Sequence, residues 1–254
     1  MEENATRSSI QVIDRMMCLL DALAQHPAPM NLKSLAAATS LHPSTAHRIL
    51  NVMVGNRLVD RIEPGTYRLG MRLLELGTLV RSRISLRDEA RPFMQELHAQ
   101  LAETVHLSVR NNDEVVYVER VATDKQLLRV PQVIGARAPL HITAVGKIFL
   151  AEDSREKCAE YVKRTAMPRF TDNTLTDPAA LMQDVDLVRE QRVAFDNEEA
   201  EKGVCCVGAG IRGDDGNLVA GLSVSAPAER FSKAWAAEVR QTAARISRAI
   251  GYTE

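Results

Sequence analysis

The polar residues of one short stretch near position 50 have the side-chain types that bind nucleic acids. Over residues 43–55, a helical period of 3.6 residues places apolar side chains on one side and polar ones on the other. The polar groups can meet phosphates and base edges, and they belong to Ser44, Thr45, His47, Arg48 and Asn51. We expect this face to hold no acid and no hydrophobic side chain, which suits a polyanion better than a protein partner.

The elements predicted around this helix are those of a winged helix-turn-helix. A short helix with Asn31 as its N-cap precedes it, and Pro43 suits its first position. The runs RLVDRI and YRLG flank the turn sequence EPGT and predict a hairpin that carries Arg61 and Arg68. In this layout the helix over 43–55 would enter the major groove of double-stranded DNA. A helical hairpin that only packs, or that serves dimerisation, is the alternative for such a pattern.

Length and composition limit the remaining choices. The chain has 254 residues, enough for two modest domains, and its 32 basic and 33 acidic residues give a net charge of -1. Because no global field attracts DNA, contacts must be local, and dimerisation would double them. No apolar run approaches the roughly 18 residues that span a bilayer, so we expect a cytoplasmic protein without membrane contact. The four cysteines form no CxxC pair, which predicts reduced thiols.

The character of the sequence changes near residues 80–86. A leucine-rich run over residues 71–84 predicts a packed connecting helix. Beyond it, β-rich runs alternate with helical patterns, and GVCCVGAGIR and LVAGLSVSA flank the hairpin signal GDDGN. These patterns predict a mixed α/β domain. Its last helix would use the apolar residues Phe231, Trp235, Val239, Ile246 and Ile250.

Four ordered segments of the chain resemble the IclR family of bacterial transcription regulators. They are NLKSLAAATSLHPSTAHRILNVMVGNRLVDR, YRLGMRLLELG, APLHITAVGKIFLA and VAFDNEEAEKGVCCVGAGIRGDDGNLVAGLSVSAP. The resemblance implies an α+β protein with a winged helix-turn-helix DNA-binding domain over 1–70, a linker and dimerisation helix over 71–85, and a GAF-like α/β effector-binding domain over 86–254. It also implies a homodimer or homotetramer. In two departures, Ser40 stands where Gly is more common, and His42-Pro43 replaces Pro-Lys ahead of Ser44.

The resemblance also implies a small-molecule cavity in the second domain. Carried over position by position, its lining residues would be Leu127, Val130, Ala144, Val145, Asp196, Cys206, Ser223 and Ser225. Ser223 and Ser225 are two apart on a predicted strand, so both hydroxyls point to one face. Free amides at a helix start near Val145 and Gly146 would add an anion site, so a small organic or aromatic acid fits best. Asp196 would repel its carboxylate unless Asp196 is protonated, accepts a ligand hydroxyl or binds backbone amides.

An enzyme that uses Cys206, Asp196 and a histidine in this cavity is the main rival function. No Lys, Arg or His adjoins Cys206 to stabilise a thiolate, and no nucleophile elbow, P-loop or Rossmann fingerprint is present. We interpret His106 and His141 as core or solvated histidines and expect no metal and no cofactor. A solvated charged face is expected for Arg81, Arg83, Arg87, Asp88, Glu89 and Arg91.

The sequence therefore predicts a ligand-responsive transcription regulator rather than an enzyme. We expect a repressor of a catabolic operon. The partners of this repressor would be a palindromic double-stranded operator, a second copy of the chain and a small-molecule effector. A transcriptional activator of the same family is the alternative.

Overall fold

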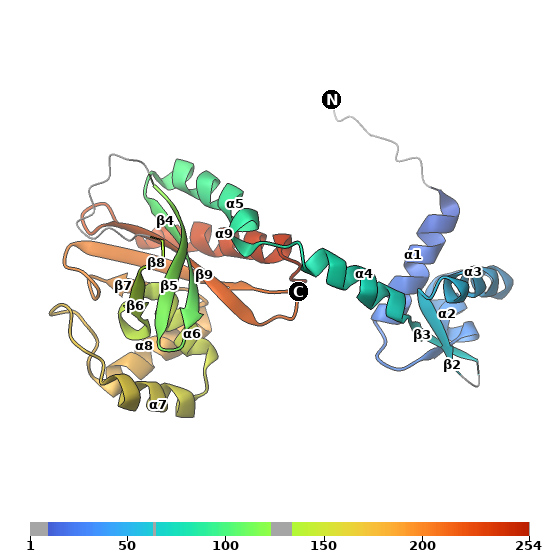
Figure 1. Ribbon diagram of the computed structural model, residues 1–254, viewed down its shortest axis with the longest axis horizontal. Helices are drawn as coiled ribbons and strands as arrows, with labels where there is room; N and C mark the ends of the chain where they lie inside the picture. The colour runs from blue at the N-terminus through green and yellow to red at the C-terminus, as the bar shows by residue number, and fades with distance from the viewer. Residues whose placement is uncertain (1–9, 63–64, 123–133, 254) are drawn as a thin grey trace. The chain divides into compact units, whose positions relative to one another are not determined.

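The chain divides into two compact units in a computed structural model that describes residues 10–62, 65–122 and 134–253 (Figure 1). The N-terminal unit comprises Met1–Ile84 and the C-terminal unit Ser85–Glu254. No helix among the described residues is both long and apolar enough to cross a membrane. Each unit has its own hydrophobic core.

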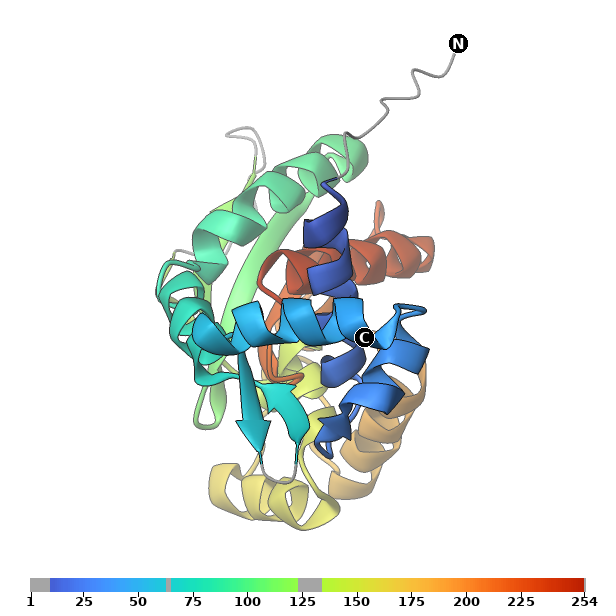
Figure 2. The ribbon, with the colours of Figure 1, turned by 90° about the vertical axis from the view of Figure 1, so that its right-hand side faces the viewer.

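The N-terminal unit is a helical core with a small antiparallel sheet. Its elements are α1 (Gln11–Ala24), β1 (Met30–Asn31), α2 (Leu32–Ala38), α3 (Pro43–Gly55), β2 (Val59–Ile62), β3 (Thr66–Leu69) and α4 (Met71–Arg81). The strand order is β1-β3-β2, and the β2–β3 hairpin lies beside α3 (Figure 2). Buried side chains from α1, α2, α3 and the hairpin meet in one core, which includes Leu19, Leu35, Leu50, Met53 and Tyr67.

Local signals set the start of α2 and of α3. The Asn31 side chain accepts a hydrogen bond from the backbone N–H of Ser34 at 2.9 Å, which confirms it as an N-cap. Pro43 is the first residue of α3, as predicted, and His42 caps the helix by accepting from the Ser44 N–H. Between the two helices, Ser40 takes the left-handed conformation with φ of 54°. Residues other than glycine are strained in this conformation. Ser40, which stands where glycine is more common, therefore lowers the stability of the turn.

The C-terminal unit is built on a six-stranded antiparallel sheet with the order β6-β5-β4-β9-β8-β7. The strands are β4 (Thr104–Asn111), β5 (Glu114–Val121), β6 (Arg137–Pro139), β7 (Ala194–Asn197), β8 (Val204–Arg212) and β9 (Leu218–Pro227). One face is covered by α5 (Leu86–Leu101) and α9 (Ala236–Ala249) (Figure 1). On the other side lie α6 (Ala144–Glu152), α7 (Arg155–Thr165) and α8 (Pro178–Gln191).

Glycines let α6 approach the sheet closely. A Cβ atom at Gly221 of β9 would overlap the Val145 side chain, and one at Gly208 of β8 would meet Ala144 at 3.2 Å. A side chain at either position would push α6 away, because protein interiors are already close-packed. The start of α6 is therefore held directly over β8 and β9, the strands that carry Cys206, Ser223 and Ser225.

The sequence predicted most elements of the C-terminal unit correctly, but it placed the start of the last helix too early. Strands β8 and β9 and the helices α5 to α8 lie where the patterns placed them. The last helix is shorter than predicted, because Phe231 and Trp235 precede α9. These two rings pack edge to face on each other at 5.7 Å, while Val239 and Ile246 hold α9 against the sheet. The helical period continues through these apolar residues, but Trp235 ends a short 3-10 helix, Lys233–Trp235, instead of belonging to α9.

Candidate nucleic-acid interface and effector cavity

The polar face of α3 lies open to solvent. Ser44, His47, Arg48 and Asn51 are exposed, and Thr45 is half-buried. The opposite face is anchored in the core through Ala46, Ile49, Leu50 and Met53. This arrangement leaves hydroxyl, imidazole, guanidinium and amide groups free to reach an edge of a DNA duplex.

Two features of this interface differ from the sequence prediction. Val52 is 62% exposed and, at 100° per residue, lies between Thr45 and Arg48 on the polar face, so the expectation of no hydrophobic side chain there is wrong. An apolar side chain in the major groove can contact a thymine methyl group. On the hairpin, Arg61 is exposed, but the Arg68 Nε lies 3.4 Å from the Asp60 carboxylate, which reduces the charge that Arg68 presents.

A cavity of about 260 Å³ lies in the C-terminal unit between the sheet and the start of α6. Six of the eight residues expected to line a cavity do line this one, namely Ala144, Val145, Asp196, Cys206, Ser223 and Ser225. Leu127 and Val130, the other two, lie outside the described residues. Alternation along β9 puts Ser223 and Ser225 on the same side, as the strand period requires.

Sequence reasoning missed several other residues that line the cavity. Ser108 and Tyr117 face each other across β4 and β5, and Phe170 comes from the loop after α7. Ser108 lies opposite Gly221, which is two residues before Ser223 on β9. The antiparallel pairing of β4 with β9 therefore puts Ser108 on the same face of the sheet as Ser223, and this pairing could have indicated it. No pattern marked Phe170. Within the described residues, the buried Ser108 hydroxyl has no hydrogen-bond partner, and a ligand is one way to satisfy it.

Asp196 is held at the cavity by backbone amides. Its Oδ1 accepts hydrogen bonds from the N–H of Glu199 at 2.7 Å and of Ala200 at 3.4 Å. Burial raises the pKa of Asp196 to about 7, although the Glu199 N–H and the charge of Lys147 oppose the rise. Asp196 thus binds backbone amides, and its raised pKa lets it take up a proton near neutral pH. These are two of the three conditions under which it would tolerate the carboxylate of a ligand.

A buried charge network supports the loop that carries Asp196. The Lys147 ammonium lies 2.7 Å from Glu199 and 2.8 Å from Asp184, and it donates to the Phe195 carbonyl at 2.9 Å. Thr174 fixes the same loop by donating to the Glu199 carbonyl at 2.7 Å. These bonds fix the position of the Asp196 carboxyl relative to α6.

The thiol of Cys206 is poorly suited to nucleophilic chemistry. Burial raises its pKa well above the usual value, and the nearby Asp196 charge adds to the rise. Its Sγ lies 3.1 Å from the Ser225 hydroxyl, which is its hydrogen-bond partner. A thiol that stays protonated does not attack substrates, so the arrangement favours a binding cavity over the enzyme alternative.

Two expectations for polar groups of the C-terminal unit are corrected. The Gly146 amide is not free, because it donates to the Thr143 hydroxyl at 3.0 Å, so the anion site at the start of α6 is partly occupied by its own N-cap. The charged residues after the connector are not only a solvated face. The buried Glu119 receives Arg87 at 2.5 Å and Arg91 at 3.6 Å, which ties α5 to the sheet.

The two histidines occupy the core. His141 is buried, with Nδ1 2.9 Å from the Tyr161 hydroxyl and Nε2 3.1 Å from the Pro168 carbonyl. His106 is buried against the edge of the Tyr117 ring at 5.2 Å. Among the described residues, no group of three or more His, Cys, Asp or Glu side chains could hold a metal ion.

Two family models match the chain over nearly its whole length. The IclR helix-turn-helix domain matches residues 12–63, and the bacterial transcriptional regulator IclR C-terminal domain matches residues 78–251. This chain belongs to the IclR family. The predicted fold class is therefore confirmed as an N-terminal helix-turn-helix domain followed by a C-terminal α/β domain with a curled sheet.

Relatives and solved structures agree with this assignment to the IclR family. The HTH-type transcriptional regulator Rv1719 of Mycobacterium tuberculosis is 39% identical over 91% of this chain and 88% of its own. The crystal structure of the Agobacterium tumefaciens repressor BlcR superposes with a TM-score of 0.82 at 26% identity, covering 96% of this chain and 98% of BlcR. An IclR homolog from Microbacterium hydrocarbonoxydans, crystallised with 4-hydroxybenzoate, has a TM-score of 0.61 at 25% identity and covers 94% and 98%.

These matches settle the choice between function classes. The matched families and the curated relatives are transcriptional regulators, so the prediction of an IclR-family regulator rather than an enzyme is confirmed. DNA is accordingly a partner of the helix-turn-helix domain.

Proposed function

We propose that this IclR-family regulator represses a catabolic operon by binding a palindromic operator through α3, and releases it when a small organic or aromatic acid fills the Asp196 cavity. The observation that carries this proposal is the exposed, acid-free polar face of α3, opposite a fully buried apolar face. Residues 1–70 would bind DNA, 71–85 would link and dimerise, and 86–254 would sense the effector. Acting on chromosomal DNA, the protein would work in the cytoplasm.

A homodimer, or a tetramer made of two such dimers, would present two copies of α3 to the two halves of an operator. Exposed apolar side chains on α4 support this part of the proposal. Leu76, Leu79 and Val80 all lie within one stripe of the helix, and each is exposed. Apolar stripes that no other part of the same chain covers are typical of protein–protein interfaces.

The effector would be an acid that also carries a hydroxyl group. Protonated Asp196 can donate to a carboxylate, and Ser108, Ser223 and Ser225 offer further hydroxyls in the cavity. The homolog crystallised with 4-hydroxybenzoate, an acid of this class, supports the choice. For such a ligand to change DNA binding, it must bind the two arrangements of the recognition helices with unequal affinity.

The test is DNA binding by an Arg48→Ala variant. Duplexes selected from a random pool by the wild-type protein serve as probes in gel-shift titrations at matched salt. If Arg48 contacts a base, its loss costs about 1–3 kcal/mol and relaxes sequence preference at one position. Arg155→Ala is the matched control, because Arg155 is an exposed arginine of α7 in the other unit. Equal affinity of Arg48→Ala and wild type would reject α3 as the recognition helix.

A further inference from the structure

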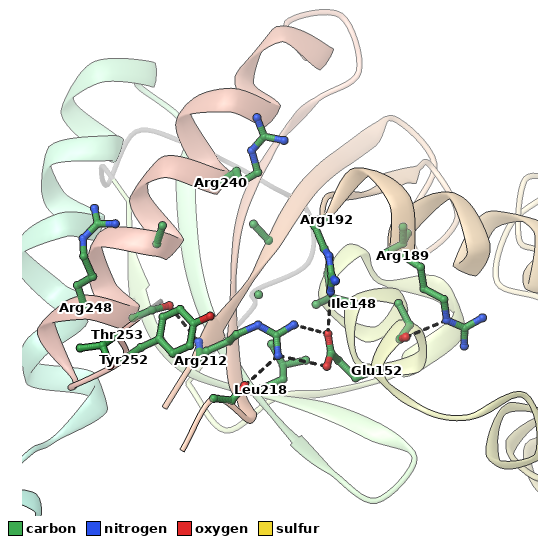
Figure 3. Close-up of a pocket in the computed structure, with 17 residues that line it drawn as sticks. Ile148, Glu152, Arg189, Arg192, Arg212, Leu218, Arg240, Arg248, Tyr252 and Thr253 are labelled. Carbon is green, nitrogen blue, oxygen red and sulfur yellow. Dashed lines mark hydrogen bonds and ion pairs between the residues drawn. The ribbon is translucent and has the colours of Figure 1, made fainter. Parts of the chain in front are cut away.

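The C-terminal unit contains a second, larger cavity that is separate from the Asp196 cavity. It is an open cleft of about 830 Å³, and the two cavities share no lining residue. Figure 3 shows it beside the end of β8, with α8 on one side and α9 on the other. Its size is within the roughly 300–1,000 Å³ of small-molecule sites.

The floor of this cleft is apolar and lies at an open edge of the sheet. Strand β7 pairs with β8 only up to Gly208, so the following residues Ala209 and Gly210 are left beside the cleft. Ile148 from α6, Val188 from α8 and Leu218 from β9 complete the floor. An apolar part of a ligand could be buried here.

The walls and rim of the cleft are strongly basic. Five arginines line it. Arg189 lies in α8 and Arg192 directly after that helix, Arg212 ends β8, and α9 carries Arg240 and Arg248. Against these five cations, Glu152 is the single acid among the described lining residues. The chain as a whole has a net charge of -1, so this concentration of one charge sign is local.

The arginines differ in how far they are already engaged. Arg189 donates to the carbonyls of Ala151 and Asp153 and pairs with Asp186, so it has a structural role. Arg212 and Arg192 both pair with Glu152, as the dashed lines in Figure 3 show. The single carboxylate of Glu152 is therefore shared between two cations.

Two arginines on α9 remain available. Arg240 is exposed, and among the described residues its guanidinium donates only to the Gln191 carbonyl, at 3.5 Å. Arg248 is also exposed, and no carboxylate of the described residues pairs with it. With Arg192 on the facing wall, these guanidinium groups can bind carboxylate or phosphate oxygens through charge-assisted hydrogen bonds.

We propose that this arginine cleft is a second ligand site, which binds a small organic anion carrying at least two negative charges. Phosphorylated and polycarboxylate metabolites share this chemistry. The apolar floor would bury the carbon skeleton, while Arg240, Arg248 and Arg192 would bind the charged groups.

Two other occupants fit the cleft less well. A second copy of this chain would bring its own arginines against these by symmetry, and like charges across an interface are unfavourable. An added peptide strand would need a longer free edge, because the Arg212 N–H already donates to the Ser247 hydroxyl at 3.0 Å. A small anion needs neither a free edge nor a partner surface.

The test is calorimetric titration of the full-length protein with citrate and with inorganic pyrophosphate, and with acetate as a singly charged comparison. We expect citrate or pyrophosphate to bind once per chain, more weakly as salt is raised, and acetate not to bind. Arg240→Glu should weaken binding at least about tenfold, since it removes a charge-assisted bond and adds repulsion. Preference for citrate or for pyrophosphate would identify the polycarboxylate or the phosphate class.

Three further variants sharpen this experiment. Glu152→Gln should strengthen binding several-fold, because it frees Arg192 and Arg212. Arg155→Glu, an exposed arginine outside the cleft, should leave binding unchanged. Ser223→Ala with Ser225→Ala should also leave it unchanged, because both residues line the other cavity.

Three results would overturn the proposal: no binding of either multiply charged anion, equal binding by Arg240→Glu and wild type, or loss of binding in the double serine variant. None of them bears on operator recognition, which Arg48→Ala tests separately. Tryptophan fluorescence of Trp235 during urea unfolding checks that each variant is folded.

Discussion

The Lys147 ammonium lies 2.7 Å from the Glu199 carboxylate, and the two side chains are only 1% and 4% exposed. Fifty-two residues separate them along the chain, yet together they fix the loop that presents Asp196 to the cavity. A buried ion pair is weak support for stability as such, but removing one partner leaves an unpaired buried charge.

Lys147→Met should therefore destabilise the C-terminal unit by about 3–5 kcal/mol. Urea unfolding followed by the fluorescence of Trp235, the single tryptophan of the chain, measures this change. Lys157→Met removes an exposed lysine and should shift stability by less than about 0.5 kcal/mol. A Lys147→Met protein as stable as the control would show that the network contributes nothing.

Asp196 should make stability depend on pH in an unusual direction. Its pKa is raised to about 7 by burial, against 3.8 for an ordinary aspartate, so the folded state holds a proton that the unfolded state has lost. The free energy of unfolding should then fall as pH rises from about 4 to 7, by at most about 1.4 kcal/mol per pH unit. Glu199, whose pKa is also raised by burial, adds to the same trend.

Asp196→Asn should flatten this profile, because the amide does not titrate while its oxygen still accepts from the Glu199 N–H. Asp172→Asn, at an exposed aspartate, should keep the wild-type slope. The measurement is urea unfolding at a series of pH values. Identical slopes in wild type and Asp196→Asn would mean that Asp196 does not carry the proton.

Ser40→Gly should stabilise the helix-turn-helix. Ser40 is held at φ of 54°, a conformation that costs an L-residue roughly 1–2 kcal/mol and glycine far less. Part of the gain is offset by the greater freedom of glycine in the unfolded chain, which leaves about 0.5–1 kcal/mol. Hydrogen exchange of the α2 and α3 amides should slow accordingly. Ser40→Ala keeps the Cβ atom and should show no such slowing; a gain in both variants would locate the effect elsewhere.

Charges placed on the apolar stripe of α4 should prevent dimerisation. Leu76→Glu with Val80→Glu puts two carboxylates where we propose that a second chain packs, and burying them unpaired is unfavourable. Sedimentation should change from dimer to monomer at the same concentration. Arg155→Glu, at an exposed arginine of α7 in the other unit, is the control and should stay dimeric. Unchanged sedimentation of the double variant would place the dimer contact on another surface.

Short-range sequence patterns determined much of this protein. The period of α3 separates its buried face from Arg48 and His47, Asn31 and Pro43 start their helices, and alternation puts Ser223 and Ser225 on one side of β9. Each depends only on neighbours within a turn or a strand. Two errors share that origin: the local pattern extended the last helix through Trp235, and it left Val52 out of the polar face.

Only the tertiary structure decided which distant groups meet. The raised pKa of Asp196 results from burial, against the opposing charge of Lys147, and the arginine cleft exists because α8, β8 and α9 bring Arg192, Arg212 and Arg240 together. The pairing of Arg87 with Glu119 was likewise visible only in the fold. Helical and strand periods are properties of adjacent residues, whereas desolvation and charge pairing depend on what the folded chain places within a few ångströms, whatever the separation in sequence.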